Sequence, residues 1–143
     1  MFRALALSML AAALSSVALA QAPTLYRQST SRGLHVFELG SSARGFRLIC
    51  DSDGAYPGQK MGAVFPFFPK DHTPTRVDFL AADGTEADFK VDARSGEILE
   101  YQSNPVQWGK LAAIVARGGT FAMVTKDDSV TLSAVPMPSL DCP

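Results

Sequence analysis

The stretch TRVDFLAADGTEADFKVDARSGEILEYQS, residues 75–103, decides the fold of this chain because apolar and charged side chains alternate along it. Val77 and Phe79 fall on one face of an extended strand, and Phe89 and Val91 fall on one face of the next. An Asp-Gly pair and an Arg-Ser-Gly triplet separate the alternating runs, as turns do. The pattern predicts a three-stranded antiparallel meander with one apolar face and one solvated, charged face.

The first hairpin of this meander has a predicted register that brings matching side chains together. A loop at residues 83–85 pairs apolar with apolar and acid with base: Val77 with Val91, Phe79 with Phe89, Asp78 with Lys90, and Arg76 with Asp92. Turn chemistry disagrees, because Gly84 is then second in a loop type that favours glycine third. The next turn has no such conflict, since Gly96 is third, and Val91 is expected to pair with Leu99.

The segments around the meander complete an all-antiparallel pattern with one helix. Residues 34–39 and 46–50 are short β-like runs, and prolines allow a strand near residues 62–68 only at an edge or with an interruption. Asn104 as N-cap, proline next and glycine at the end predict a short α-helix over residues 105–117. A last hairpin is expected with Met123 facing Leu132. We predict a mainly β fold, an antiparallel β-sandwich or half-barrel of about seven short strands with the helix at one side or end.

The first residues, MFRALALSMLAAALSSVALAQAPT, predict a secretory signal peptide. Arg3 gives a positive start, an apolar run follows, and Ala18-Leu19-Ala20 provides a small-residue cleavage signal. We expect this signal to end at residue 20, a flexible lead-in over 21–33 and one β-rich domain over 34–143. The remaining 123 residues (143 − 20) suffice for one core, and the protein is expected to be periplasmic or secreted.

The charge pattern argues against two classes of partner. Without Arg3 the chain has 12 basic residues (13 − 1) against 14 acidic ones, and no basic run occurs. Nucleic-acid binding depends on clustered Lys and Arg, so we expect no nucleic-acid partner. The scattered charges do not suggest a membrane-surface patch either, and we expect no membrane insertion after signal cleavage.

The two cysteines, Cys50 and Cys142, are predicted to form a disulfide. An even count in an oxidising compartment favours pairing, and the two positions are 92 apart (142 − 50). Closing so long a loop contributes on the order of 4–5 kcal/mol in the chain-entropy picture. The bridge would anchor a terminus that otherwise frays.

Motifs for catalysis or metal binding are weak, so we expect no cofactor, no metal site and no enzyme activity. The CDSDG motif (50–54) fails the calcium-loop pattern at several ligand positions, and the GSSARG motif (40–45) lacks the second glycine of a nucleophile elbow. The two histidines are far apart, whereas zinc and copper sites usually show closely spaced ones. Two alternatives stay open: a small hydrolase using His72 with Asp71 or Asp78, and a binder of a small ligand or metal.

The best candidate for a functional surface is the aromatic and proline-rich segment VFPFFPKDH (64–72) with the residues just before it. Aromatic side chains and methionine are enriched at the centres of protein interfaces. The competing interpretation places the phenylalanines in the core, because a small domain needs its large apolar side chains there. The candidate partner-binding residues are Tyr56, Met61, Phe65, Phe67, Phe68 and His72.

The layout as a whole points to a class of protein rather than to a site. A signal peptide, one early and one late cysteine, a meander, a short helix and a final hairpin resemble the general layout of periplasmic proteins of the invasion-associated locus B type. No motif transfers functional residues from that family to this chain. We predict a non-enzymatic interaction module, an envelope accessory or inhibitor-like protein, whose partner is another envelope or secreted protein.

Overall fold

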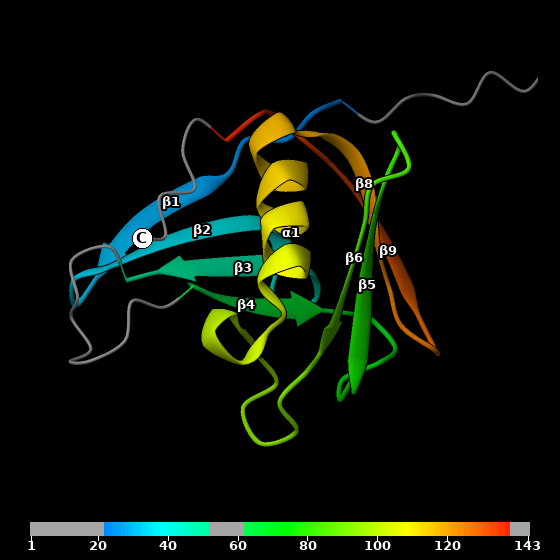
Figure 1. Ribbon diagram of the computed structural model, residues 1–143. Coiled ribbons are helices and arrows are strands. Elements are labelled where there is room, and N and C mark those ends of the chain that lie inside the picture. The colour runs from blue at the N-terminus through cyan, green and yellow to red at the C-terminus, as the bar shows by residue number, and fades with distance from the viewer. Residues whose placement is uncertain (1–21, 52–61, 138–143) are drawn as a thin grey trace, which may run out of the picture.

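The computed structural model describes residues 22–51 and 62–137, which form two antiparallel sheets and one α-helix (Figure 1). The five-stranded sheet has the order β1 (Arg27–Ser31), β2 (Leu34–Ser41), β3 (Arg44–Cys50), β4 (Gly62–Phe67) and β7 (Ile98–Leu99). The four-stranded sheet has the order β6 (Glu86–Lys90), β5 (Arg76–Ala81), β8 (Gly119–Val124) and β9 (Ser129–Ala134). A 3₁₀ turn, η1 (Glu100–Gln102), and helix α1 (Pro105–Arg117) connect β7 to β8. This confirms the prediction of a mainly β fold consistent with a sandwich.

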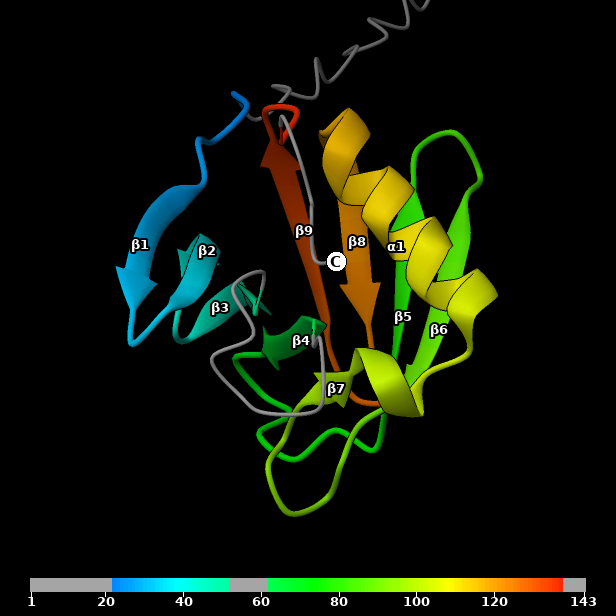
Figure 2. The same cartoon turned by 60° about the vertical axis from the view of Figure 1, so that its left-hand side comes forward.

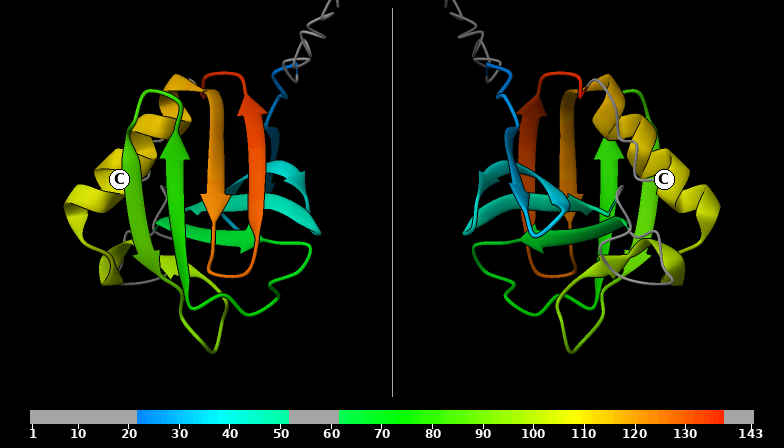
Figure 3. Two further views of the ribbon diagram at one scale, coloured as in Figure 1. Left: turned by 90° about the vertical axis from the view of Figure 1, so that its right-hand side faces the viewer. Right: turned by 90° about the vertical axis from the view of Figure 1, so that its left-hand side faces the viewer.

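The core lies between the two sheets, whose strands cross steeply (Figure 3). A chain of edge-to-face aromatic contacts runs through it from one sheet to the other and on to the helix. The ring centroids are 6.1 Å apart for Tyr26–Phe46, 6.4 Å for Phe46–Phe79, 5.9 Å for Phe79–Phe89 and 6.2 Å for Phe89–Trp108. The large side chains therefore unite both sheets and the helix into one core.

Helix α1 has the bounds that its capping residues predict. The Asn104 side chain accepts a hydrogen bond from the Val106 amide, proline stands at the first position, and Gly118 ends the helix with a positive φ of 69°. Figure 2 shows α1 running along the four-stranded sheet beside β6. Its buried side chains are Trp108, Leu111, Ile114 and Val115, so the helix fills one side of the sandwich as predicted.

The register of the β5–β6 hairpin differs from the predicted one by two residues. Val77 pairs with Phe89 and Asp78 with Asp88, so the apolar faces still match but the predicted acid–base pairs do not form. The Ala81 amide bonds to the Thr85 carbonyl (2.9 Å), which leaves a loop of residues 82–84. Its third residue is Gly84, with a φ of 87°, so turn chemistry and not charge pairing sets the register.

The predicted third strand of the meander is wrong. After the turn that contains Gly96, the chain leaves β6, and Ile98 and Leu99 pair with Val64 and Ala63 of β4 in the other sheet. Residues 100–102 form the 3₁₀ turn instead of a strand. Ile98 is fully buried, so the crossover gains core burial that continuing beside β6 would not provide.

The β8–β9 hairpin forms where expected but is also shifted by two residues. Phe121 pairs with Leu132 and Met123 with Val130, whereas the prediction paired Met123 with Leu132. A shift of two keeps the same side chains on the inner face, so the apolar pattern cannot distinguish the two registers. The turn settles the register, because the Thr125 amide bonds to the Asp128 carbonyl (2.9 Å).

The predicted flexible lead-in contains a strand. Residues 27–31 form β1, which pairs with β2 through a two-residue turn in which Arg32 and Gly33 both have positive φ. Such a turn matches the twist of a hairpin, but an arginine in this conformation is an uncommon signal. The expected strand near residues 62–68 is β4. Only Ala63 and Val64 of β4 pair with β7, so Pro66 lies on a part of the strand that is an edge among the described strands. A proline is tolerated there because no neighbouring strand on that side accepts a hydrogen bond from its position.

Candidate functional site

The six candidate partner-binding residues do not form one exposed surface in the described part of the chain. Phe68 is 3% exposed and belongs to the core. Phe65 and Phe67 are half-buried on the other face of β4, where the Arg47 guanidinium lies 5.8 Å from the centre of the Phe67 ring. His72 is exposed, and Tyr56 and Met61 lie outside the described residues. The interpretation that phenylalanines of this segment supply core volume therefore holds for Phe68.

In the described chain, no hydrogen bond or ion pair joins His72 to Asp71 or Asp78, the residues of the hydrolase alternative. His72 makes no hydrogen bond or ion pair with residues in 22–51 or 62–137. The Asp78 carboxylate instead contacts the Arg76 guanidinium at 3.3 Å, and the same guanidinium is 2.9 Å from Asp88. Within those ranges no cluster of three or more His, Cys, Asp or Glu has a geometry suited to a metal ion.

The predicted disulfide falls partly outside the described chain. Cys50 is the last residue of β3 and is 2% exposed, and Asp51 beside it is 1% exposed. Cys142 lies beyond residue 137, so the Cys50–Cys142 bridge stays a prediction. The described helices include none that is both long and apolar enough to cross a membrane.

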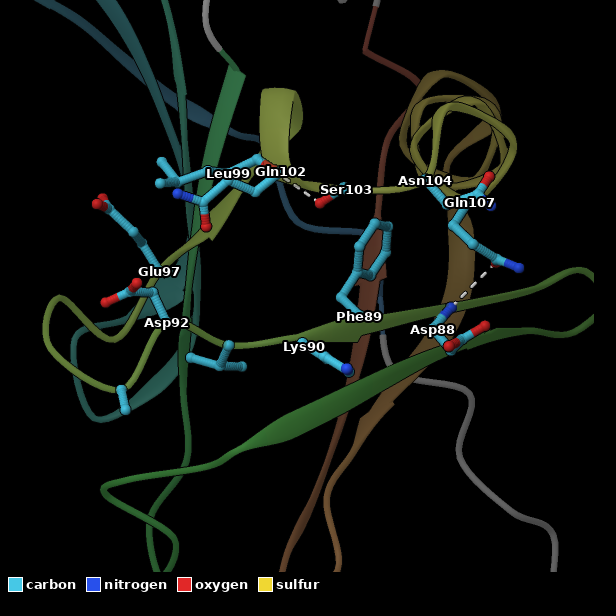
Figure 4. Close-up of a pocket in the computed structure, with 12 residues that line it drawn as sticks. Asp88, Phe89, Lys90, Asp92, Glu97, Leu99, Gln102, Ser103, Asn104 and Gln107 are labelled. Atoms are coloured by element: carbon cyan, nitrogen blue, oxygen red, sulfur yellow. Dashed lines mark hydrogen bonds between the residues drawn. The ribbon is translucent and has the colours of Figure 1, made fainter.

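A cleft of about 610 Å³ is lined by described residues outside the aromatic segment. It lies where β6, the turn after β6, η1 and the start of α1 meet, and Figure 4 shows side chains from all these elements around it. We call it the amide cleft, after its three carboxamide side chains. Its lining residues are Asp88, Phe89, Lys90, Val91, Asp92, Ala93, Glu97, Leu99, Gln102, Ser103, Asn104 and Gln107.

Half of the polar side chains that line the amide cleft bond to the surrounding backbone. The Gln107 side-chain carbonyl accepts from the Asp88 amide (3.2 Å), and the Asn104 carbonyl accepts from the Val106 amide (2.8 Å). The Ser103 hydroxyl donates to the Leu99 carbonyl (2.7 Å). Because the side-chain oxygens of Asn104 and Gln107 accept from the backbone, the amino groups of these two residues remain available as donors.

The strand edge at the cleft presents backbone groups as well. The Asp88 amide bonds to Gln107 of α1, so at residue 88 the backbone points away from β5. Hydrogen-bonding direction alternates along an antiparallel strand, and the Val91 amide accordingly points back to the Thr75 carbonyl (3.0 Å). The N–H and C=O of Lys90 therefore point into the amide cleft, where they have no backbone partner in the described chain.

The charges of the amide cleft are mainly negative. Its charged lining residues are three acids and one base: Asp88, Asp92, Glu97 and Lys90. The backbone amides of Ser95 and Arg94 bond to the Asp92 carboxylate and hold its pKa below the usual value. These bonds also order the turn between β6 and β7.

Beside the cleft, Gly62, Glu100 and Trp108 make a tightly packed junction. The Gly62 amide donates to the Glu100 carboxylate at 2.7 Å. A Cβ added at Gly62 would lie 2.3 Å from the Trp108 ring and 2.8 Å from that carboxylate, so only glycine fits. Burial raises the pKa of Glu100, and the bond from Gly62 only partly opposes this shift.

Comparison with protein families, with curated proteins and with solved structures finds no match to this chain. The predicted resemblance in layout therefore stays a prediction, and the candidate site rests on geometry alone. Sequence reasoning interpreted Asp88, Asp92 and Glu97 as part of a solvated sheet face. The capping pattern of Asn104 predicted where α1 begins, but it gave no signal that this end of the helix lies beside β6, because that position depends on the chain crossing to β7.

Proposed function

We propose that this protein is a small secreted or periplasmic interaction module without catalytic activity, and that its amide cleft binds an extended segment of a partner protein. The partner is expected to be another envelope or secreted protein. Support comes from the cleft itself, whose rigid polar groups are arranged beside an unpaired strand edge. The proposal moves the expected binding surface from the aromatic segment to the junction of β6 and α1.

The observation that carries this proposal is the direction of the Lys90 backbone groups. Its N–H and C=O point into the cleft, and an extended peptide pairs with such groups by adding a strand to the sheet. The amino groups of Asn104 and Gln107 lie on the opposite wall and donate to peptide carbonyls. Asp92 and Glu97 favour a partner segment that carries Lys or Arg near this site.

A proline substitution tests the strand edge directly. Lys90→Pro removes the N–H that points into the cleft without removing a bond to β5, because that N–H points away from β5. Lys90→Ala is the matched control, since it removes the same charged side chain and keeps the N–H. The purified protein and both variants are immobilised at equal density, and proteins retained from the envelope and secreted fractions of the source cells are quantified.

The expected result is a partner retained by the parent and by Lys90→Ala and reduced about tenfold with Lys90→Pro, corresponding to ~1.4 kcal/mol. Thermal unfolding of all three proteins confirms that they are folded. The proposal fails if no protein is retained above the level of a bare matrix. It also fails if folded Lys90→Pro retains the same partner as well as the parent does.

A further inference from the structure

A second cleft, of about 280 Å³, lies between the β2–β3 turn of one sheet and β9 of the other, away from the amide cleft. Its lining comes from both sheets and from the segment before β1, and we call it the hydroxyl cleft. The lining residues are Thr24, Leu39, Gly40, Ser41, Arg44, Thr131, Leu132 and Ser133. This lining contains one arginine and four hydroxyl side chains, and no carboxylate is among the described lining residues.

Several donors of the hydroxyl cleft have no partner in the part of the chain that the structure describes. The Arg44 guanidinium makes no ion pair or hydrogen bond with residues in 22–51 or 62–137. The hydroxyls of Thr24, Thr131 and Ser133 make none with those residues either. In contrast, the other arginine beside this turn, Arg27, is paired with Glu38 at 3.3 Å. The cleft thus keeps a positive charge and several donors available to a ligand.

The remaining polar groups of this cleft are arranged in favour of an anion. The Ser41 hydroxyl oxygen accepts from the amides of Ala43 (3.3 Å) and Arg44 (3.2 Å), so its own proton remains to be donated. The Gly40 carbonyl, which would repel an anion, accepts a hydrogen bond from the Arg27 guanidinium at 3.2 Å. The positive charge of Arg27 therefore offsets the partial negative charge of the Gly40 carbonyl oxygen.

Backbone bonds between the segment before β1 and the end of β9 hold one wall of the hydroxyl cleft in place. The Thr24 amide donates to the Ser133 carbonyl (2.8 Å), and the Val135 amide donates to the Thr24 carbonyl (3.2 Å). Opposite, Gly40 and Gly45 pair so closely that a Cβ on either would lie within 2.3 Å of a backbone oxygen. Leu39 and Leu132 are buried, and they make the only apolar part of the described lining.

From this arrangement we propose that the hydroxyl cleft is a binding site for a compact oxyanion, a phosphate or sulfate group. Arginine has donors only and matches such a group with two parallel bonds. The surrounding hydroxyls donate to the remaining oxygens, as at other phosphate sites. The anion is either free in solution or the terminal group of a larger ligand, since the cleft is not enclosed.

The test is a titration of the isotope-labelled protein followed by amide chemical shifts. The probes are inorganic phosphate, inorganic sulfate and glycerol phosphate, with sodium chloride at matched ionic strength as the reference. Saturable shifts are expected at Gly40, Arg44, Thr131 and Ser133. Saturation by glycerol phosphate as well as by the inorganic ions indicates recognition of the group, and saturation by the inorganic ions alone indicates a site for the free anion.

Three variants make the test specific. Arg44→Gln is expected to weaken binding about tenfold or more, and Thr131→Val about threefold, because each removes donors and Thr131→Val keeps the volume. Arg94→Gln is the control, since it changes the net charge equally but lies in the turn after β6 and not in this cleft. The proposal is overturned if the shifts do not saturate beyond the chloride reference, or if Arg94→Gln weakens binding as much as Arg44→Gln does.

Discussion

The amide cleft and the hydroxyl cleft differ in what their polar side chains bond to. In the amide cleft, Asn104, Gln107, Ser103 and Asp92 each bond to the backbone, so they form part of the folded framework. In the hydroxyl cleft, Arg44 and three hydroxyl side chains have no partner in the described chain. Polar side chains that line a cleft can therefore support the fold or remain available to a ligand. The free energy of unfolding separates the two roles, because only the first kind of side chain should stabilise the protein.

The largest effect is expected at the packed junction beside the amide cleft. Gly62→Ala inserts a methyl group against the Trp108 ring and the Glu100 carboxylate, so it should lower the free energy of unfolding by about 2–3 kcal/mol. Denaturant unfolding measures this loss.

Gly109→Ala is the matched control for Gly62→Ala. An added Cβ there meets nothing within 4 Å, and alanine favours the helix, so this variant should gain up to about 1 kcal/mol. Equal behaviour of the two alanine variants would show that the junction is not tightly packed.

A smaller effect compares the two linings directly. Asn104→Ala removes the N-cap of α1 and should cost about 1 kcal/mol of unfolding free energy. Thr131→Val in the hydroxyl cleft should change it by less than about 0.5 kcal/mol, because its exposed hydroxyl has no partner in the described chain. The distinction between the clefts breaks down if Thr131→Val costs as much as Asn104→Ala in the same denaturant series.

Near the hydroxyl cleft, a variant should stabilise the protein. The Tyr26 hydroxyl is buried and has no hydrogen-bond partner in the described chain, and burial raises the pKa of the phenol so that it remains neutral. Tyr26→Phe removes this unpaired group, keeps the edge-to-face contact with Phe46 and should gain about 1 kcal/mol. Thermal unfolding checks the sign, and a loss of stability would mean that the hydroxyl has a partner.

The smallest effect is a pH dependence at Glu100. Burial raises the pKa of Glu100, so the folded state holds its proton more tightly than the unfolded state does. That contribution is fully present below the ordinary glutamate pKa and is lost as the pH rises through the raised pKa. Glu100→Gln keeps an acceptor for the Gly62 amide and avoids the buried charge.

The Glu100→Gln variant should therefore be more stable than the parent at pH 7 by about a few tenths of a kcal/mol, because solvent screens this half-exposed group. The difference should vanish near pH 3, where the carboxylate of the parent is protonated. Unfolding curves at both pH values measure it. A variant that is less stable than the parent at pH 7 contradicts the expected sign.

Sequence reasoning predicted the elements whose signals are local. The bounds of α1 follow from Asn104, Pro105 and Gly118, since capping depends on residues within one turn. The inner faces of β5, β6, β8 and β9 follow from alternation. Registers were missed by two residues, because such a shift leaves every side chain on its face, and for β5–β6 only Gly84 at the third loop position distinguishes the alternatives.

The candidate sites were beyond the reach of sequence reasoning. The amide cleft joins Lys90 of β6 to Gln107 of α1, and the hydroxyl cleft joins Arg44 to Thr131, which is far away in the chain. No short motif encodes either combination. Both depend on which strands become neighbours and on how the sheets cross, and these follow from the burial of side chains that are distant in sequence.

The sequence by itself therefore determined a mainly β chain with one capped helix, since alternation and capping are properties of neighbouring residues. Only the tertiary structure decided that Ile98 and Leu99 leave the meander of residues 75–103 for β4 in the other sheet. The apolar character of Ile98 and Leu99 alone does not indicate which of the two sheets they join. The choice rests on core burial, because Ile98 is fully buried in the core where it pairs with Val64.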